Sequence, residues 1–148
     1  MNNKLLYPHL LKNVIMPIAD KIMDTKYMYY LRFIEKMNKW SSLEIEEWQN
    51  ELLINLISHA YNNTKYYNEL MKRMKLSPSD IRVVEDLKKL PVLKKEYVAK
   101  HYDEFVPGNI NNFRFIKNST GGSTGDPMRF LSDIDFLCFA QANRIYSW

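Results

Sequence analysis

The clearest hydrophobic pattern in the chain begins after residue 41 and predicts a long α-helix. Ser41 and Glu44 have the spacing of a capping box, in which each side chain bonds to the backbone of the other residue. Apolar residues then recur at intervals of three and four positions, which is typical of one helix face. They are Ile45, Trp48, Leu52, Leu56 and Ala60, with Leu53 and Ile57 beside them.

Further helices are predicted on both sides of this one. The apolar residues between 18 and 39 favour a single amphipathic helix, and shorter helices are expected over 66–74 and 94–104. Ser77 before Pro78 marks another helix start, and 86–91 is predicted to form one helical turn that Pro91 stops. Asp133 is expected to cap a final helix, in which Cys138 packs in an apolar setting. Because no Gly or Pro follows, we expect the chain to be cut within that helix.

The hydrophobic period changes near residue 113. Phe113–Lys117 alternates apolar and basic residues, and Pro127–Leu131 has a similar pattern, so both are predicted to be short strands. The expected fold class is therefore α/β and rich in α-helix. Its order is helices, a β-strand, a Ser/Thr/Gly loop, a second β-strand and a helix.

The loop between the two strands consists of seven small residues that suit phosphate binding. Glycine permits the backbone conformations in which N–H groups converge on an anion, and hydroxyl groups donate to phosphate oxygens. A Walker loop is excluded because Asp126 follows the last glycine where that pattern needs lysine, and the glycine spacing of a dinucleotide loop is absent. A flexible Ser/Gly hairpin without a ligand is the alternative. The candidate phosphate contacts are Ser119, Thr120, Gly121, Gly122, Ser123, Thr124 and Gly125.

The segment from Asn118 to Pro127 resembles the phosphate-binding signature of the adenylate-forming (AMP-binding) enzyme superfamily. It is most similar to the branch that contains phenylacetate–coenzyme A ligases and related capsular-polysaccharide biosynthesis proteins. Two upstream segments, 60–67 and 86–95, resemble conserved segments of that branch in the same order. The resemblance covers about residues 42 to 148.

The resemblance implies a two-step reaction with a carboxylic acid as substrate. ATP and the acid would give an acyl-adenylate and pyrophosphate, with Mg²⁺ sharing the phosphate charge, and coenzyme A or another nucleophile would then take the acyl group. Thr120 and Thr124 are the hydroxyls expected to matter most. The superfamily often has lysine where this chain has Met128, and either Arg129 or Lys117 could compensate.

The resemblance also implies a division of the chain. Residues 1–40 would form an N-terminal helical extension, and 41–148 the N-terminal portion of a ligase domain truncated at its C-terminus. No catalytic residue is expected in this portion, and alone it is expected to be inactive.

Composition leaves one other function open. The net charge is +4, and Lys and Arg outnumber Asp and Glu between Met71 and Lys100. A non-catalytic helical module could therefore use its Ser/Gly loop or this basic segment to bind a protein or a polyanion. No nucleic-acid motif, metal-ligand spacing or transmembrane segment is present in the sequence, and we expect a cytoplasmic protein.

Overall fold

The computed structural model describes residues 10–121 and 127–147, and within them the chain divides into two compact units. One unit comprises the chain up to Trp40 together with the segment from Ser132, and the other comprises Ser41–Leu131. The sequence division into 1–40 and 41–148 shares the boundary after Trp40. The contacts group the C-terminal helix with the N-terminal helices, whereas the domain division itself stays a prediction.

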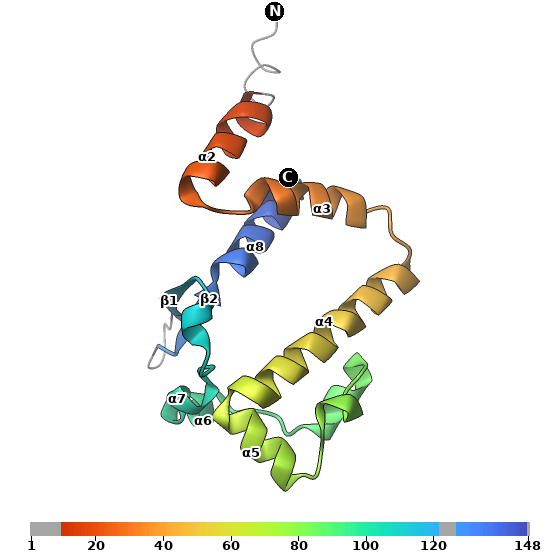
Figure 1. Ribbon diagram of the computed structural model, residues 1–148, viewed down its shortest axis with the longest axis vertical. Coiled ribbons are helices and arrows are strands. Elements are labelled where there is room, and N and C mark those ends of the chain that lie inside the picture. The colour runs from red at the N-terminus through yellow and green to blue at the C-terminus, as the bar shows by residue number, and fades with distance from the viewer. Residues whose placement is uncertain (1–9, 122–126, 148) are drawn as a thin grey trace, which may run out of the picture. The chain divides into compact units, whose positions relative to one another are not determined.

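The first unit is entirely helical in its described part. A short π-helix, Leu11–Ile15, continues into α2 (Met16–Met23), which is followed by α3 (Tyr27–Met37). The C-terminal helix α8 (Ile134–Tyr146) packs against α3 (Figure 1). The core of this unit contains residues from both α3 and α8. The buried residues are Met28, Leu31, Ile34 and Ala142, and the partly buried Met16, Tyr30 and Phe139 pack around them.

The predicted single helix over 18–39 was wrong, because a corner separates α2 from α3. Asp24 closes α2 in a left-handed conformation with φ of 50°. The Asp20 carboxylate accepts hydrogen bonds from the backbone N–H groups of Tyr27 and Met28 at 3.0 and 2.7 Å. These bonds satisfy the first donors of α3, so a side chain from one helix begins the next.

The second unit contains the long helix, a series of short helices and a hairpin. Helix α4 (Ser42–Asn63) is followed by α5 (Lys65–Arg73), and two 3-10 helices span Pro78–Asp80 and Val84–Lys89. Next come α6 (Lys95–Lys100), α7 (Tyr102–Phe105) and a 3-10 turn, Ile110–Asn112. Strands β1 (Phe115–Ser119) and β2 (Arg129–Asp133) form a two-stranded antiparallel sheet. The mixed, mostly helical fold class is confirmed.

Helix α4 confirms the predicted capping box and corrects the predicted face. The Ser41 backbone N–H donates to the Glu44 carboxylate at 2.7 Å, and the Glu44 N–H donates back to Ser41 Oγ at 3.3 Å. The buried residues, however, are Leu53 and Ile57, whereas Leu52 and Leu56 are exposed. The predicted helix is present, but α5 and the loop that follows it pack on Leu53 and Ile57, which lie beside the predicted apolar face.

Two other boundaries differ from the sequence prediction. The helix expected over 94–104 is split at His101 into α6 and α7, and both strands lie two residues later than predicted. The predicted cap of the last helix is confirmed, since Asp133 Oδ1 accepts from the Phe136 N–H at 3.0 Å. Cys138 is buried, as its apolar setting predicted.

The core of the second unit generates a stability prediction at Met71. This side chain is fully buried against Leu53, Ile57 and Ile81. Met71→Ala should lower the free energy of unfolding by about 2–5 kcal/mol, because it removes buried apolar atoms and leaves a cavity. Met74→Ala is the matched control, since Met74 caps the same helix and is 40% exposed. Chemical denaturation measures both, and equal losses would contradict this description of the core.

A second prediction concerns acid stability at Asp86. The Lys89 ammonium and the backbone N–H groups of Arg82 and Val83 lower the pKa of Asp86 from 3.8 to about 2. A carboxyl with a depressed pKa stabilises the fold fully above its unfolded pKa of about 4, and this contribution is lost as the pH falls towards 2. The wild-type advantage in melting temperature over Asp86→Asn should therefore shrink between pH 5 and pH 2. A gap that stays constant over this range would contradict the assignment.

Candidate functional site

The two ends of the Ser/Thr/Gly loop are joined by a pair of hydrogen bonds. The Thr120 backbone N–H donates to the Met128 carbonyl oxygen at 2.9 Å, and the Met128 N–H donates to Thr120 Oγ1 at 3.0 Å. The threonine hydroxyl thus occupies the place that a carbonyl would take in a regular antiparallel pair. Since a hydroxyl has one proton and two lone pairs, Thr120 can still donate to a ligand.

Of the seven predicted phosphate contacts, three lie within the described residues. Ser119 is the exposed last residue of β1, Thr120 is half-buried, and Gly121 is exposed. Gly122, Ser123, Thr124 and Gly125 lie outside the described residues. The structure therefore places the start and the base of the predicted site.

The backbone conformation at position 121 does not require glycine. The φ of Gly121 lies outside the left-handed range, and a Cβ built on it would meet no atom of the described residues within 4 Å. Among the described residues, no neighbouring atom therefore explains why position 121 is a glycine.

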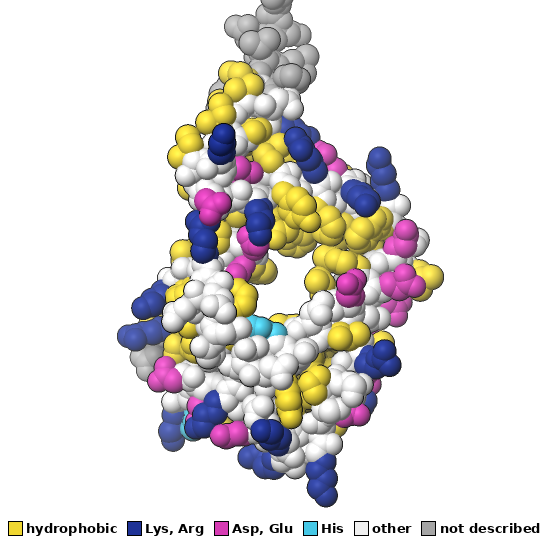
Figure 2. All heavy atoms as spheres, viewed as in Figure 1, with side chains coloured by type: hydrophobic (Ala, Val, Ile, Leu, Met, Phe, Trp, Pro, Cys, Tyr) yellow, Lys and Arg dark blue, Asp and Glu magenta, His cyan; other side chains and the backbone are white. Residues whose placement is uncertain are grey.

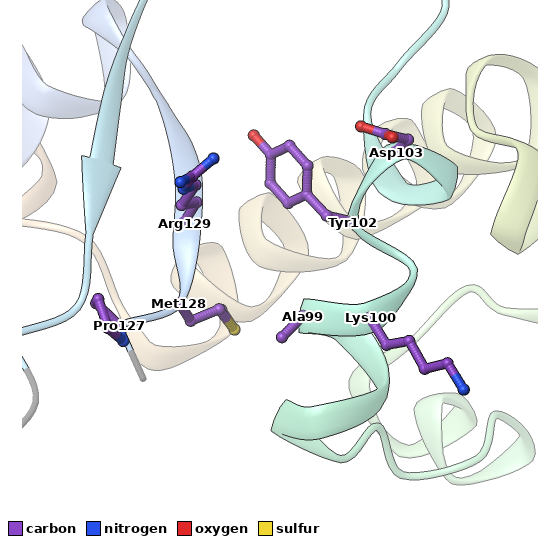
Figure 3. Close-up of a pocket in the computed structure, with 7 residues that line it drawn as sticks. All are labelled: Ala99, Lys100, Tyr102, Asp103, Pro127, Met128 and Arg129. Atoms are coloured by element: carbon purple, nitrogen blue, oxygen red, sulfur yellow. The ribbon is translucent and has the colours of Figure 1, made fainter. Parts of the chain in front are cut away.

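A hollow of about 370 Å³ lies beside the exit of the loop, and its volume falls within the range of small-molecule sites. One wall is the segment that leads from the loop into β2, and the other comes from α6 and α7 (Figure 3). The lining residues are Ala99, Lys100, Tyr102, Asp103, Pro127, Met128 and Arg129.

The hollow has a polar part and an apolar part. Figure 3 shows the Arg129 and Tyr102 side chains facing one another across it, whereas the Met128 side chain extends towards Ala99. Lys100 also lines the hollow, but its ammonium points away from Arg129 and Tyr102. The arrangement pairs hydrogen-bond donors with a small apolar surface.

Sequence reasoning missed the wall formed by α6 and α7. The sequence of 94–104 predicts only a short helix, and nothing in its local pattern shows that Tyr102 lies opposite the loop exit. Arg129 is one of the two cations expected to compensate for the missing lysine, although strict strand alternation would place it on the opposite face from Met128. Both residues nevertheless line the hollow, and Met128 lies directly before the first residue of β2.

Aromatic packing holds this wall in place. The Tyr66 ring of α5 stacks on Phe105 of α7 at a centroid distance of 4.3 Å and also contacts Tyr97 of α6 at 5.7 Å. Burial raises the pKa of the Tyr66 hydroxyl, in agreement with this packed position. After α7, the Gly108 N–H donates to the Asn63 carbonyl at 2.7 Å, which joins the end of α4 to the segment that leads to β1.

The upstream segments that carry the family resemblance have structural roles here. Thr64 begins α5 by accepting from the Tyr67 N–H at 3.3 Å, and Tyr66 supplies the aromatic contact described above. In the second segment, Lys89 donates to the Asp86 carboxylate at 2.8 Å and to the Asp80 carbonyl at 2.6 Å. Tyr66 supports the wall formed by α6 and α7, whereas the bonds of Lys89 hold the Val84–Lys89 helix to the segment before it, and none of these residues lines the hollow.

Neither a cluster of metal ligands nor a membrane-spanning helix occurs among the described residues. Within 10–121 and 127–147, no group of three or more His, Cys, Asp or Glu side chains is arranged to hold a metal ion. In the same part of the chain, no helix combines the length and the apolar character needed to cross a bilayer.

Comparison with known proteins gave one informative similarity. No family model matches the chain. Protein CapK of Staphylococcus aureus is 29% identical over 128 residues, which cover 85% of this chain and 27% of the relative. The chain therefore spans about a quarter of the length of the curated protein that it resembles.

Proposed function

We propose that this chain forms the N-terminal, phosphate-binding part of an ATP-dependent, AMP-forming acyl ligase. The observation that carries the proposal is the Ser/Thr/Gly loop, closed at its base by Thr120 and Met128 and set beside a hollow that Arg129 lines. Similarity to Protein CapK supports the narrower branch, and we propose capsular-polysaccharide biosynthesis as the setting. Residues of the remaining ligase would supply the acid and adenine pockets.

The proposed reaction begins with attack by a carboxylate oxygen on the α-phosphorus of ATP. A bond forms between that oxygen and phosphorus, and the bond to the bridging oxygen breaks, so that pyrophosphate leaves and an acyl-adenylate remains. In the second step a nucleophile, such as the thiol of coenzyme A, attacks the acyl carbon and releases AMP. The loop contributes by binding the phosphates whose negative charge grows as pyrophosphate departs.

The residues described at the loop suit this role in two respects. Ser119 and Thr120 carry hydroxyl donors, and Gly121 leaves room for an anion to approach the backbone. Mg²⁺ is usually bound through one or two carboxylates together with substrate phosphates and water, so a dedicated protein cage is not required. We propose that it enters with ATP, where it neutralises phosphate charge.

The alternative is a helical module that binds a polyanion through its basic segment. The Lys and Arg side chains between Met71 and Lys100 are exposed, but Lys89 is bonded to Asp86. On the face seen in Figure 2, basic side chains are interspersed with acidic ones rather than gathered in one patch. Because a polyanion-binding surface needs clustered positive charge, this mixed distribution favours the ligase over the polyanion-binding module.

The proposed function predicts that Thr124→Val impairs adenylate formation. In the protein expressed from its complete gene, carboxylate-dependent exchange of pyrophosphate into ATP should fall at least about tenfold, because a phosphate donor is removed. Thr25→Val makes the same chemical change where the hydroxyl donates to Asp20, and it should leave exchange per folded molecule unchanged. Unchanged exchange in Thr124→Val would refute the phosphate-loop assignment.

Gly121→Ala separates a ligand-binding role from a structural one. Because a Cβ at this position meets no atom of the described residues within 4 Å, the melting temperature should change by less than about 2 °C. Exchange activity should nevertheless fall about tenfold, since the added methyl group occupies the space through which phosphate oxygens reach the loop. If stability drops while activity per folded molecule is retained, Gly121 serves the hairpin and not the ligand.

A further inference from the structure

The polar part of the hollow has the composition of an oxyanion site. Arg129 presents a planar guanidinium that can hold two oxygens of one group, and the facing Tyr102 hydroxyl is a further donor. In the part of the chain that the structure describes, neither side chain is engaged in a hydrogen bond or an ion pair. Their donors are therefore available to a ligand.

The position of the hollow connects it to the predicted phosphate loop. Met128 lines the hollow and is also the residue that Thr120 holds through two hydrogen bonds. Arg129 follows directly, so the guanidinium is carried by the strand that leaves the loop. Lys117, the other candidate cation, belongs to β1 and is not among the residues that line the hollow.

We propose that this hollow binds the pyrophosphate group, with Arg129 and Tyr102 as its donors. The inference rests on the proposed function, which it deepens by assigning the leaving group to a particular set of side chains. Arg129 then supplies the positive charge at the loop exit, and Lys117 does not. As the bond from the α-phosphorus to the bridging oxygen breaks, Arg129 stabilises the negative charge that the bridging oxygen gains.

The charges around the hollow favour a multiply charged anion over a carboxylate. Arg129 and Lys100 both line it, and the Lys100 side chain has a flexible four-carbon stem that can turn towards a bound ligand. Pyrophosphate carries more negative charge and more oxygens than one carboxylate group, so it gains more from two cations and Tyr102 acting together. Asp103 on the same wall weakens anion binding, because its carboxylate repels an anion.

Isothermal titration of pyrophosphate into the protein expressed from its complete gene tests the proposal without any catalytic step. Arg129→Ala should weaken pyrophosphate binding about tenfold or more. Arg129→Lys should weaken it less, because lysine keeps the positive charge but cannot donate two parallel hydrogen bonds as a guanidinium does. Tyr102→Phe should weaken binding a few-fold, and Asp103→Asn should strengthen it, since a like charge is removed. Melting temperatures of all variants establish that each one is folded.

Lys117→Ala is the matched control, because it removes an exposed cation from the same hairpin. It should change pyrophosphate affinity by less than twofold. Equal losses in Lys117→Ala and Arg129→Ala would show diffuse attraction to a basic surface and would overturn the proposal. Wild-type affinity in Arg129→Ala, or no measurable binding by the wild-type protein, would also overturn it.

A second arm uses benzoate at matched ionic strength to distinguish a phosphate site from a carboxylate site. Benzoate affinity that depends on Arg129, together with pyrophosphate affinity that does not, would reassign the hollow and refute the proposal. Failure of the proposed pyrophosphate site can be distinguished from failure of the proposed ligase function. Arg129-dependent pyrophosphate binding without carboxylate-dependent exchange would support the hollow and contradict the ligase.

Discussion

The pairing of Thr120 with Met128 is the interaction on which the arrangement of the site depends. It closes the loop with one backbone bond and one side-chain bond, and it fixes where the chain leaves the loop. From that point Met128 and Arg129 enter the wall of the hollow, so a local hydrogen-bond pair determines the position of a cation. A valine at position 120 would keep the shape of the side chain but leave the Met128 N–H without this acceptor.

The opposite wall depends on packing between parts of the chain that are distant in sequence. Tyr66 stacks on Phe105 and contacts Tyr97, and the Gly108 N–H bonds to the Asn63 carbonyl. These contacts place α6 and α7, from which Tyr102 faces the loop exit. Tyr66, which belongs to the upstream segment 60–67, thus helps to position one wall of the hollow.

Local interactions were predictable from the sequence, and long-range ones were not. The Ser41–Glu44 capping box and the Asp133 cap each depend on residues three positions apart, so their spacing was sufficient. The corner after α2 was missed because Asp20 acts on backbone donors seven and eight residues away. The buried face of α4 and the position of Tyr102 depend on tertiary packing, which leaves no periodic signal in the local sequence.

The proposed function and the proposed role of the hollow both require that phosphates bind at the loop and the hollow together. The most direct measurement is the map of amide and arginine side-chain NMR shifts when Mg²⁺–ATP is added to the isotope-labelled protein. We predict that the resonances of Gly121 and the Arg129 guanidinium move at the lowest nucleotide concentrations. Shifts confined to the basic segment between Met71 and Lys100, with Gly121 and Arg129 unchanged, would contradict the account.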